Sequence, residues 1–198
     1  ICIFFLKIRP PPRFTLDRSY AASDVYKRQK QIPTNYSVKN IEEKLNNKKE
    51  LAERFNLPFD ENIPIIGLIS RLFDSKGLDL VQKAFADLMK LDVQVVLLGT
   101  GDQKYHALFD KMASKYPKKF ASYLGFNDEL AHLIEAGSDM FLMPSKYEPC
   151  GLNQMYSLAY GTVPIVRETG GLADTVVKFN DKTEKRTGFV FKKNETEE

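Results

Sequence analysis

The chain has 198 residues, of which 43% are hydrophobic and 28% are charged, and its formal net charge is +3. These values describe an ordinary globular chain that can bury one core or two small ones, and they exclude a disordered protein. Because the charge is small and no apolar run approaches the ~20 residues of a membrane helix, we expect neither a nucleic-acid partner nor a membrane span.

The cysteine content predicts a reducing, cytoplasmic setting. Cys2 and Cys150 lie at opposite ends of the sequence and form no spacing pattern. This usage is not typical of a disulfide scaffold or of a zinc site. We therefore expect neither a disulfide nor a zinc site.

The chain changes character twice before its regular part begins. Residues 1–29 contain a short apolar stretch and three successive prolines, and we expect an unrelated or disordered leader there. Residues 30–62 are predicted to form a linker and a helix, with apolar residues at helical spacing over 39–56 and Pro58 just beyond. Residues 63–198 form the expected main domain.

From residue 63 onward, short apolar runs alternate with segments of helical periodicity. The expected strands are 63–70, 93–99, 120–125, 139–144 and 163–167. The expected helices are 78–90, 103–116, 128–137, 151–161 and 171–179. Apolar strands that are each followed by a helix predict an α/β fold with a Rossmann-like, doubly wound, mainly parallel sheet. Such a sheet binds ligands outside the carboxyl ends of its strands.

The loop after the first strand carries two cations. Arg71 and Lys76 lie five positions apart where a helix opens, which is typical of a site for a diphosphate. A helix cap by Asp74 or Ser75 beside two solvated cations explains the same residues equally well.

The loop after the second strand resembles part of a dinucleotide fingerprint. Gly99 and Gly101 have the right spacing, but Lys104 stands where a third glycine is needed. A tight turn from strand to helix is the better explanation.

Two further loops carry features of a ligand site. Phe126 lies at a loop apex, where its ring can stack on a base or instead pack onto the core. Gly170 and Gly171 open a helix, and such a pair lets backbone N–H groups approach an anion.

The stretch SKYEPCGLNQ, residues 145–154, places Glu148 where a buried strand gives way to a helix. Together, the loops assemble two cations, an aromatic ring, a carboxylate and paired glycines at one sheet edge. This combination suits a nucleotide diphosphate whose attached group reacts near Glu148.

Several separated motifs resemble the bacterial glycogen synthases and the plant starch synthases. They are SRL-x₃-KG, PS-x₂-EPCGL-x-Q and TGGLADTV, preceded by the linker-like IPTNYS at 32–37. The resemblance covers roughly residues 30–198 and rests on motifs that agree in order and spacing.

The resemblance implies the C-terminal, donor-binding half of a retaining glucosyltransferase of the two-lobed GT-B architecture. Such enzymes transfer glucose from ADP-glucose, or from UDP-glucose in some members, to the non-reducing end of an α-1,4-glucan without a metal ion. The acceptor site lies largely in the family's N-terminal lobe, which this sequence does not include. We therefore expect little catalysis from the chain alone.

The resemblance also implies roles for individual residues. Arg71 and Lys76 contact the diphosphate, Phe126 faces the adenine, and Glu148 contacts the donor glucose. Cys150 lies beside the sugar site, although a buried packing thiol explains it as well. Other residues expected at the sugar and phosphate sites are Gly151, Leu152, Tyr156, Thr169, Gly170 and Gly171. Tyr156 stands where many relatives of this architecture have a second glutamate.

Two other interpretations remain open from the sequence. One is a nucleotide-sugar epimerase or another GT-B transferase, such as a relative of sucrose synthase. The other is a non-catalytic Rossmann-like module that binds NAD or a protein partner.

Overall fold

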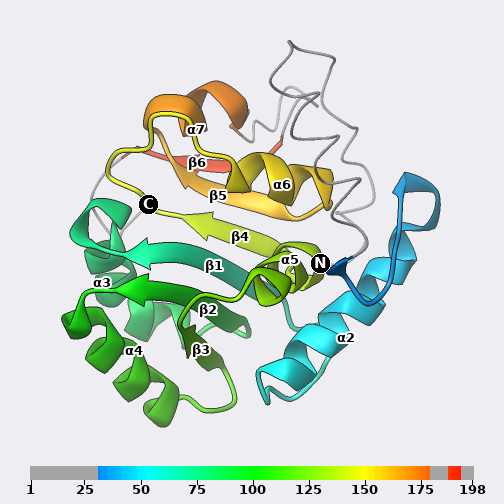
Figure 1. Cartoon of the computed structure of the whole chain (residues 1–198), viewed down its shortest axis with the longest axis horizontal. Coiled ribbons are helices and arrows are strands. Elements are labelled where there is room, and N and C mark those ends of the chain that lie inside the picture. The colour runs from blue at the N-terminus through cyan, green and yellow to red at the C-terminus, as the bar shows by residue number, and fades with distance from the viewer. Residues whose placement is uncertain (1–30, 179–186, 193–198) are drawn as a thin grey trace.

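The computed structural model describes residues 31–178 and 187–192 (Figure 1). The expected leader, residues 1–29, lies outside this part of the chain. Among the helices described, none is both long and apolar enough to cross a membrane.

The core of the fold is a six-stranded sheet in which all neighbouring strands pair in parallel. The strands are β1 (Ile65–Leu72), β2 (Gln94–Gly101), β3 (Phe120–Leu124), β4 (Met140–Met143), β5 (Val163–Arg167) and β6 (Phe189–Phe191). Their order is β3-β2-β1-β4-β5-β6. The chain thus adds β2 and β3 on one side of β1 and then β4, β5 and β6 on the other side, which makes the boundary between β1 and β4 the switch point of the sheet. A doubly wound sheet opens a crevice at this switch point.

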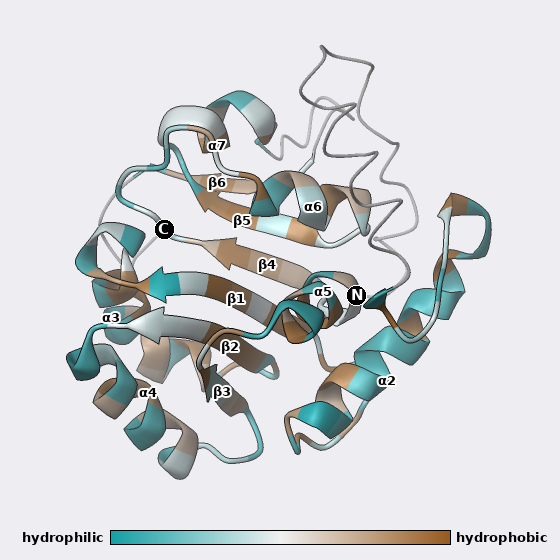
Figure 2. Cartoon of the chain, viewed as in Figure 1, coloured by the Kyte–Doolittle hydropathy of each residue, from teal (hydrophilic) through white to brown (hydrophobic). Residues whose placement is uncertain are grey.

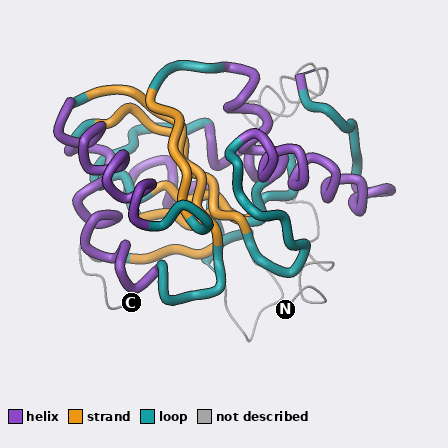
Figure 3. The backbone as a smooth tube through the Cα atoms, turned by 90° about the horizontal axis from the view of Figure 1, so that it is seen from below, coloured by secondary structure: helices purple, strands orange, loops and turns teal. Residues whose placement is uncertain are grey.

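Helices lie on both sides of the sheet (Figure 3). They are η3 (Val38–Glu43), α2 (Lys44–Arg54), η4 (Asp74–Lys76), α3 (Leu78–Leu88), α4 (Gln103–Lys115), α5 (Asp128–Gly137), α6 (Asn153–Ala159) and α7 (Gly170–Thr175). The predicted α/β class and doubly wound parallel sheet are confirmed.

The strands in the middle of the sheet are mostly hydrophobic (Figure 2), and core clusters cover both faces of the sheet. On β2, Val96 and Leu98 pack into the cluster that contains α2 and α5, whereas Val95 and Leu97 pack against α3 and α4. Because side chains alternate across a strand, a strand buried on both faces must be apolar at successive positions.

The helix expected within residues 30–62 shares this core. In α2, Leu51 and Ala52 are fully buried, and they belong to the same cluster as Leu133 and Ile134 of α5. Helix α2 therefore packs against the domain of residues 63–198.

Most boundaries differ from the sequence prediction by one or two residues, and three differences have a clear physical reason or are larger. β1 runs to Leu72 because Arg71 and Leu72 pair with Thr100 and Gly101 of β2. α7 ends at Thr175, four residues earlier than expected. β6 was not predicted, because three residues at a sheet edge produce too short a periodic pattern.

Candidate functional site

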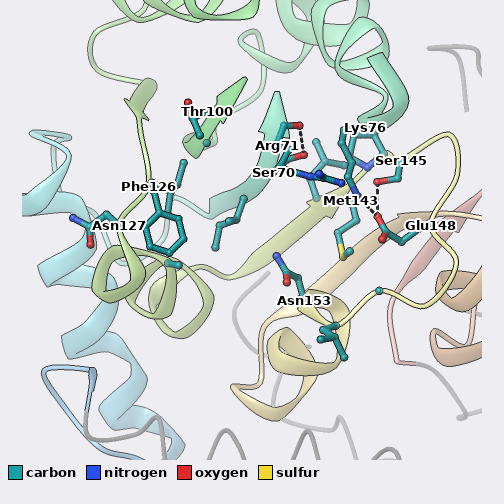
Figure 4. A pocket seen from close by; sticks show the side chains of 18 of the residues that line it. Ser70, Arg71, Lys76, Thr100, Phe126, Asn127, Met143, Ser145, Glu148 and Asn153 are labelled. Carbon is teal, nitrogen blue, oxygen red and sulfur yellow. Dashed lines mark hydrogen bonds and ion pairs between the residues drawn. The ribbon is translucent and has the colours of Figure 1, made fainter. Parts of the chain in front are cut away.

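A cavity of about 310 Å³ opens at the carboxyl ends of the strands, beside the switch between β1 and β4 (Figure 4). Six of the residues expected at the site line it: Arg71, Lys76, Phe126, Glu148, Gly151 and Leu152. They come from the end of β1 and from three separate connections between a strand and the following helix, and the fold brings them together at one edge.

Arg71 presents an accessible cation to this cavity. It lies near the end of β1, is exposed, and holds its guanidinium carbon 5.9 Å from the centre of the Phe73 ring. Within residues 31–178 and 187–192 it forms no ion pair. Its donors are therefore available to an anionic ligand.

The alternative in which Asp74 or Ser75 caps the helix is wrong. Neither side chain caps η4 or α3. The carboxylate of Asp74 instead accepts hydrogen bonds from Lys104 Nζ at 2.6 Å and Tyr105 Oη at 2.5 Å. These hydrogen bonds lower the pKa of Asp74 and attach η4 to α4.

Lys76 and Glu148 meet across the two loops that face each other at the switch point. Lys76 Nζ lies 2.5 Å from Glu148 Oε2, and their side chains are 21% and 15% exposed. The hydroxyl of Ser145 donates to the same carboxylate oxygen at 3.1 Å. A cation and a carboxylate therefore share one wall of the cavity.

Backbone contacts lock these two loops together. Gly77 has a φ of +69°, and a Cβ at this position would lie 1.9 Å from the carbonyl oxygen of Pro144. The N–H of Lys146 donates to the carbonyl oxygen of Ser75 at 2.9 Å. Only glycine permits this approach, which fixes Lys76 relative to the loop that carries Glu148.

The paired glycines at the start of α7 support the Glu148 loop from behind. A Cβ on Gly170 would lie 2.2 Å from the carbonyl oxygen of Glu148, and one on Gly171 would lie 1.9 Å from that of Cys150. The Gly171 N–H donates to the Glu148 carbonyl at 3.0 Å. Thr169 caps this helix at the backbone level, and its hydroxyl lies 3.4 Å from the Lys146 carbonyl oxygen. These three residues lie behind the loop and not among those lining the cavity.

Gln154 was not identified as a site residue from the sequence, although it belongs to the EPCGL-x-Q motif. Its buried amide nitrogen donates to the carbonyl oxygens of Cys150 at 3.2 Å and Gly151 at 3.0 Å, and to Thr175 Oγ1 at 3.1 Å. Gln154 therefore holds the Glu148 loop onto α7.

Cys150 and Tyr156 lie apart from the cavity lining. Cys150 is exposed, so its interpretation as a buried packing thiol is wrong. Tyr156 packs against a buried cluster that includes Tyr36 and Tyr160. The structure thus does not bring Tyr156 to the cavity.

Phe126 projects from the loop between β3 and α5 into solvent at the cavity (Figure 4). It is 85% exposed, so the alternative in which it packs onto the core is wrong. The adjacent Asn127 accepts the N–H of Leu130 at 2.9 Å and caps α5, which fixes the loop. An exposed ring on a fixed loop is suited to stacking.

The glycines that were expected in a tight turn after the second strand lie within that strand instead, where they have a structural role. Gly99 and Gly101 lie inside β2, and a Cβ on Gly99 would lie 2.0 Å from the carbonyl oxygen of Ser70. Their absence of side chains lets β2 lie against β1, so they do not form a dinucleotide loop.

The sequence is similar to curated bacterial glycogen synthases. It is 53% identical to that of Pseudothermotoga lettingae over 167 residues and 51% identical to that of Bacillus cereus over 160 residues. These matches cover 84% and 81% of this chain and 34% of each relative. The chain therefore spans about a third of the length of these relatives. The matches to glycogen synthases do not favour the alternative of a nucleotide-sugar epimerase.

The fold is similar to that of solved glycosyltransferases. The catalytic domain of starch synthase IV from Arabidopsis thaliana, bound to ADP and acarbose, has a TM-score of 0.77 and 32% identity, over 83% of this chain and 35% of that one. Sucrose-phosphate synthase from Thermosynechococcus elongatus has a TM-score of 0.58 and 22% identity, over 75% of this chain and 36% of that one, and shows the shared fold alone. The model for "Glycosyl transferases group 1" matches residues 49–198. The chain therefore belongs to the group 1 glycosyl transferase family.

Proposed function

We propose that this chain is the donor-binding half of a retaining glucosyltransferase that elongates an α-1,4-glucan with glucose from ADP-glucose. One observation carries the proposal: Arg71, Lys76, Phe126 and Glu148 line a single cavity at the sheet's switch point. The similarity to glycogen synthases and to an ADP-bound starch synthase supports the choice of donor.

Arg71 and Lys76 hold the diphosphate of the donor. Cleavage of the bond between sugar and diphosphate develops negative charge on the leaving phosphate, and cations that bind this charge lower the barrier. The planar guanidinium of Arg71 can donate two hydrogen bonds to phosphate oxygens, whereas the ammonium of Lys76 supplies a point charge beside Glu148. With these cations in place, we expect no metal ion to be needed.

Glu148 contacts the donor glucose beside the anomeric carbon of the sugar and orients it. Positive charge develops on the sugar as the bond breaks, and a nearby carboxylate stabilises it. The carboxylate is also a hydrogen-bond acceptor for sugar hydroxyls. The proposed position of Glu148 is compatible with both retaining routes, through an enzyme nucleophile or on the face of the leaving phosphate.

Phe126 stacks on the nucleotide base. An exposed ring at the cavity offers an apolar face to adenine or uracil. UDP-glucose is therefore the alternative donor.

We expect the acceptor glucan to bind largely to regions found in the longer relatives, because this chain covers about a third of their length. We expect the chain alone to bind nucleotide but to turn over little. A cytoplasmic location is likewise a prediction.

Calorimetric titration of the chain with ADP, UDP and NAD tests the proposal. We expect saturable ADP binding that is stronger than NAD binding and roughly tenfold weaker in Arg71→Ala, because a charge-assisted contact is lost. Arg54→Ala is the matched control, because Arg54 is an accessible arginine that pairs with Glu50 and Glu129 away from the cavity. A folded chain that binds none of the three nucleotides, or prefers NAD, would overturn the proposal.

A further inference from the structure

We propose that Ser145 is a positioning residue that orients Glu148 toward the donor glucose. The inference rests on the proposed function, because it assumes that Glu148 contacts the sugar. It adds to that function a residue outside the cations, the base-stacking ring and the glycine-rich loops.

Ser145 and Lys76 hold the same oxygen of the Glu148 carboxylate. The hydroxyl of Ser145 and the ammonium of Lys76 lie 3.1 Å and 2.5 Å from Oε2 (Figure 4). Among the described residues, no hydrogen bond to Oε1 is formed, and Glu148 lines the cavity. One oxygen is thus fixed by the protein and the other is left for a ligand.

Ser145 is held more rigidly than Lys76. It is 4% exposed and directly follows Pro144, whose carbonyl lies against Gly77. Serine has one short side-chain torsion, whereas the lysine ammonium ends a flexible four-carbon stem. The position of the Ser145 hydroxyl is therefore set by the end of β4 and the turn that packs against it.

This difference matters when the diphosphate binds. Lys76 then donates to phosphate oxygens, and its contact with Glu148 weakens as the ammonium is drawn toward the ligand. The Ser145 hydroxyl sits on a short, buried side chain, so it cannot follow the ligand in this way. It therefore keeps Oε2 in place while Oε1 accepts from the sugar.

The loss of Ser145 should affect glucose recognition and leave nucleotide recognition intact. In Ser145→Ala, the carboxylate keeps its charge but loses one of its two anchors. We expect ADP affinity within about twofold of the unmodified chain and ADP-glucose affinity roughly fivefold lower, as for one lost hydrogen bond. Calorimetric titrations with the two ligands measure this ratio.

Ser138→Ala is the matched control. Ser138 and Ser145 flank β4 at its opposite ends, and they are 0% and 4% exposed. Ser138 Oγ is buried and has no hydrogen-bond partner among the described residues, so Ser138→Ala reports the effect of removing a buried hydroxyl by itself, and the change in the ADP-glucose to ADP ratio should occur only in Ser145→Ala.

A double-mutant cycle with Glu148→Ala separates positioning from a structural effect. If Ser145 acts through Glu148, adding Ser145→Ala to Glu148→Ala leaves the ADP-glucose affinity unchanged. An equal loss in both backgrounds, or an unchanged ratio in the single variant, would refute the positioning role while ADP binding still supported the proposed function. No ADP binding by the unmodified chain would remove the proposed function itself, and the inference with it.

Discussion

The two edges of the sheet both carry cationic side chains, but they use them differently. At the amino edge, Lys48 is 4% exposed and contacts Asp139 Oδ2 at 3.0 Å and the carbonyl oxygen of Glu61 at 3.0 Å. Asp139 in turn accepts the N–H of Ile65, where β1 begins, at 2.7 Å. The ammonium of Lys48 therefore holds α2 against the amino ends of the strands.

At the carboxyl edge, Arg71 and Lys76 line a cavity. Arg71 is exposed, and Lys76 shares a cavity wall with Glu148. A buried cation with protein partners stabilises the fold, whereas a cation with spare donors at a cavity can bind a ligand. The same residue type thus has a structural role at one edge and a proposed binding role at the other.

The largest effect is expected at two glycines with the same backbone conformation. Gly77 and Gly161 both have a φ of +69°, but a Cβ would lie 1.9 Å from the Pro144 oxygen at Gly77 and 3.4 Å from Ile41 Cδ1 at Gly161. We expect Gly161→Ala to lower the free energy of unfolding by about 1–2 kcal/mol through backbone strain alone. Gly77→Ala should cost more than ~3 kcal/mol and abolish ADP binding, because the clash separates the two loops. Urea unfolding and ADP titration measure both, and equal effects of the two variants would show that the loop contact is unimportant.

Replacing Lys48 should damage the fold without changing the cavity. In Lys48→Met, Asp139 and the Glu61 carbonyl lose their partner, and we expect a loss of roughly 2–3 kcal/mol in the free energy of unfolding. ADP affinity, measured below the unfolding transition, should stay within about twofold. A large loss of affinity in the folded variant would contradict the division between the edges.

Replacing Lys76 should have the opposite consequence. We expect Lys76→Met to weaken ADP binding about tenfold and to reduce its dependence on salt, because a charge-assisted contact is lost. The free energy of unfolding should change by less than about 1 kcal/mol, since the ion pair with Glu148 is partly exposed. Unchanged ADP affinity would remove Lys76 from the diphosphate site.

The smallest effect concerns pH and Lys44. Burial lowers the pKa of Lys44 to about 7, against the attraction of Asp139. The folded state therefore releases a proton that the unfolded chain still holds between about pH 7 and pH 10, so this residue makes stability rise with pH over that range. We expect the free energy of unfolding to rise by about 1–2 kcal/mol between pH 7 and pH 9. This is less than the whole pKa shift of Lys44 would give, because the residue keeps some contact with solvent. Urea unfolding of the unmodified chain and Lys44→Met checks the sign, and parallel pH profiles would contradict it.

The sequence predicted the sheet well because its strands are buried on both faces. Successive apolar residues such as Val95, Val96, Leu97 and Leu98 have no solvent-exposed alternative in a globular chain. β6 was not predicted, because an edge strand of three residues is too short to show a clear hydrophobic pattern.

The candidate site was predicted in part. Loops that follow parallel strands must meet at one edge, so the sequence alone predicted that Arg71, Phe126 and Glu148 lie together. The packing behind these loops could not be read from the sequence. The approach of Gly171 to Cys150 and the contacts of Gln154 depend on how α6 and α7 lie against each other.

An amide-resolved NMR titration of the chain with ADP would locate the ligand on one edge or the other. We predict shift changes concentrated in residues 70–77, 125–127 and 145–153 at the carboxyl edge, with little change at 137–139 and 160–162 at the amino edge. Changes concentrated at the amino edge, or no change at any ADP concentration in a folded sample, would contradict a nucleotide-sugar site at the carboxyl ends of β1 and β4.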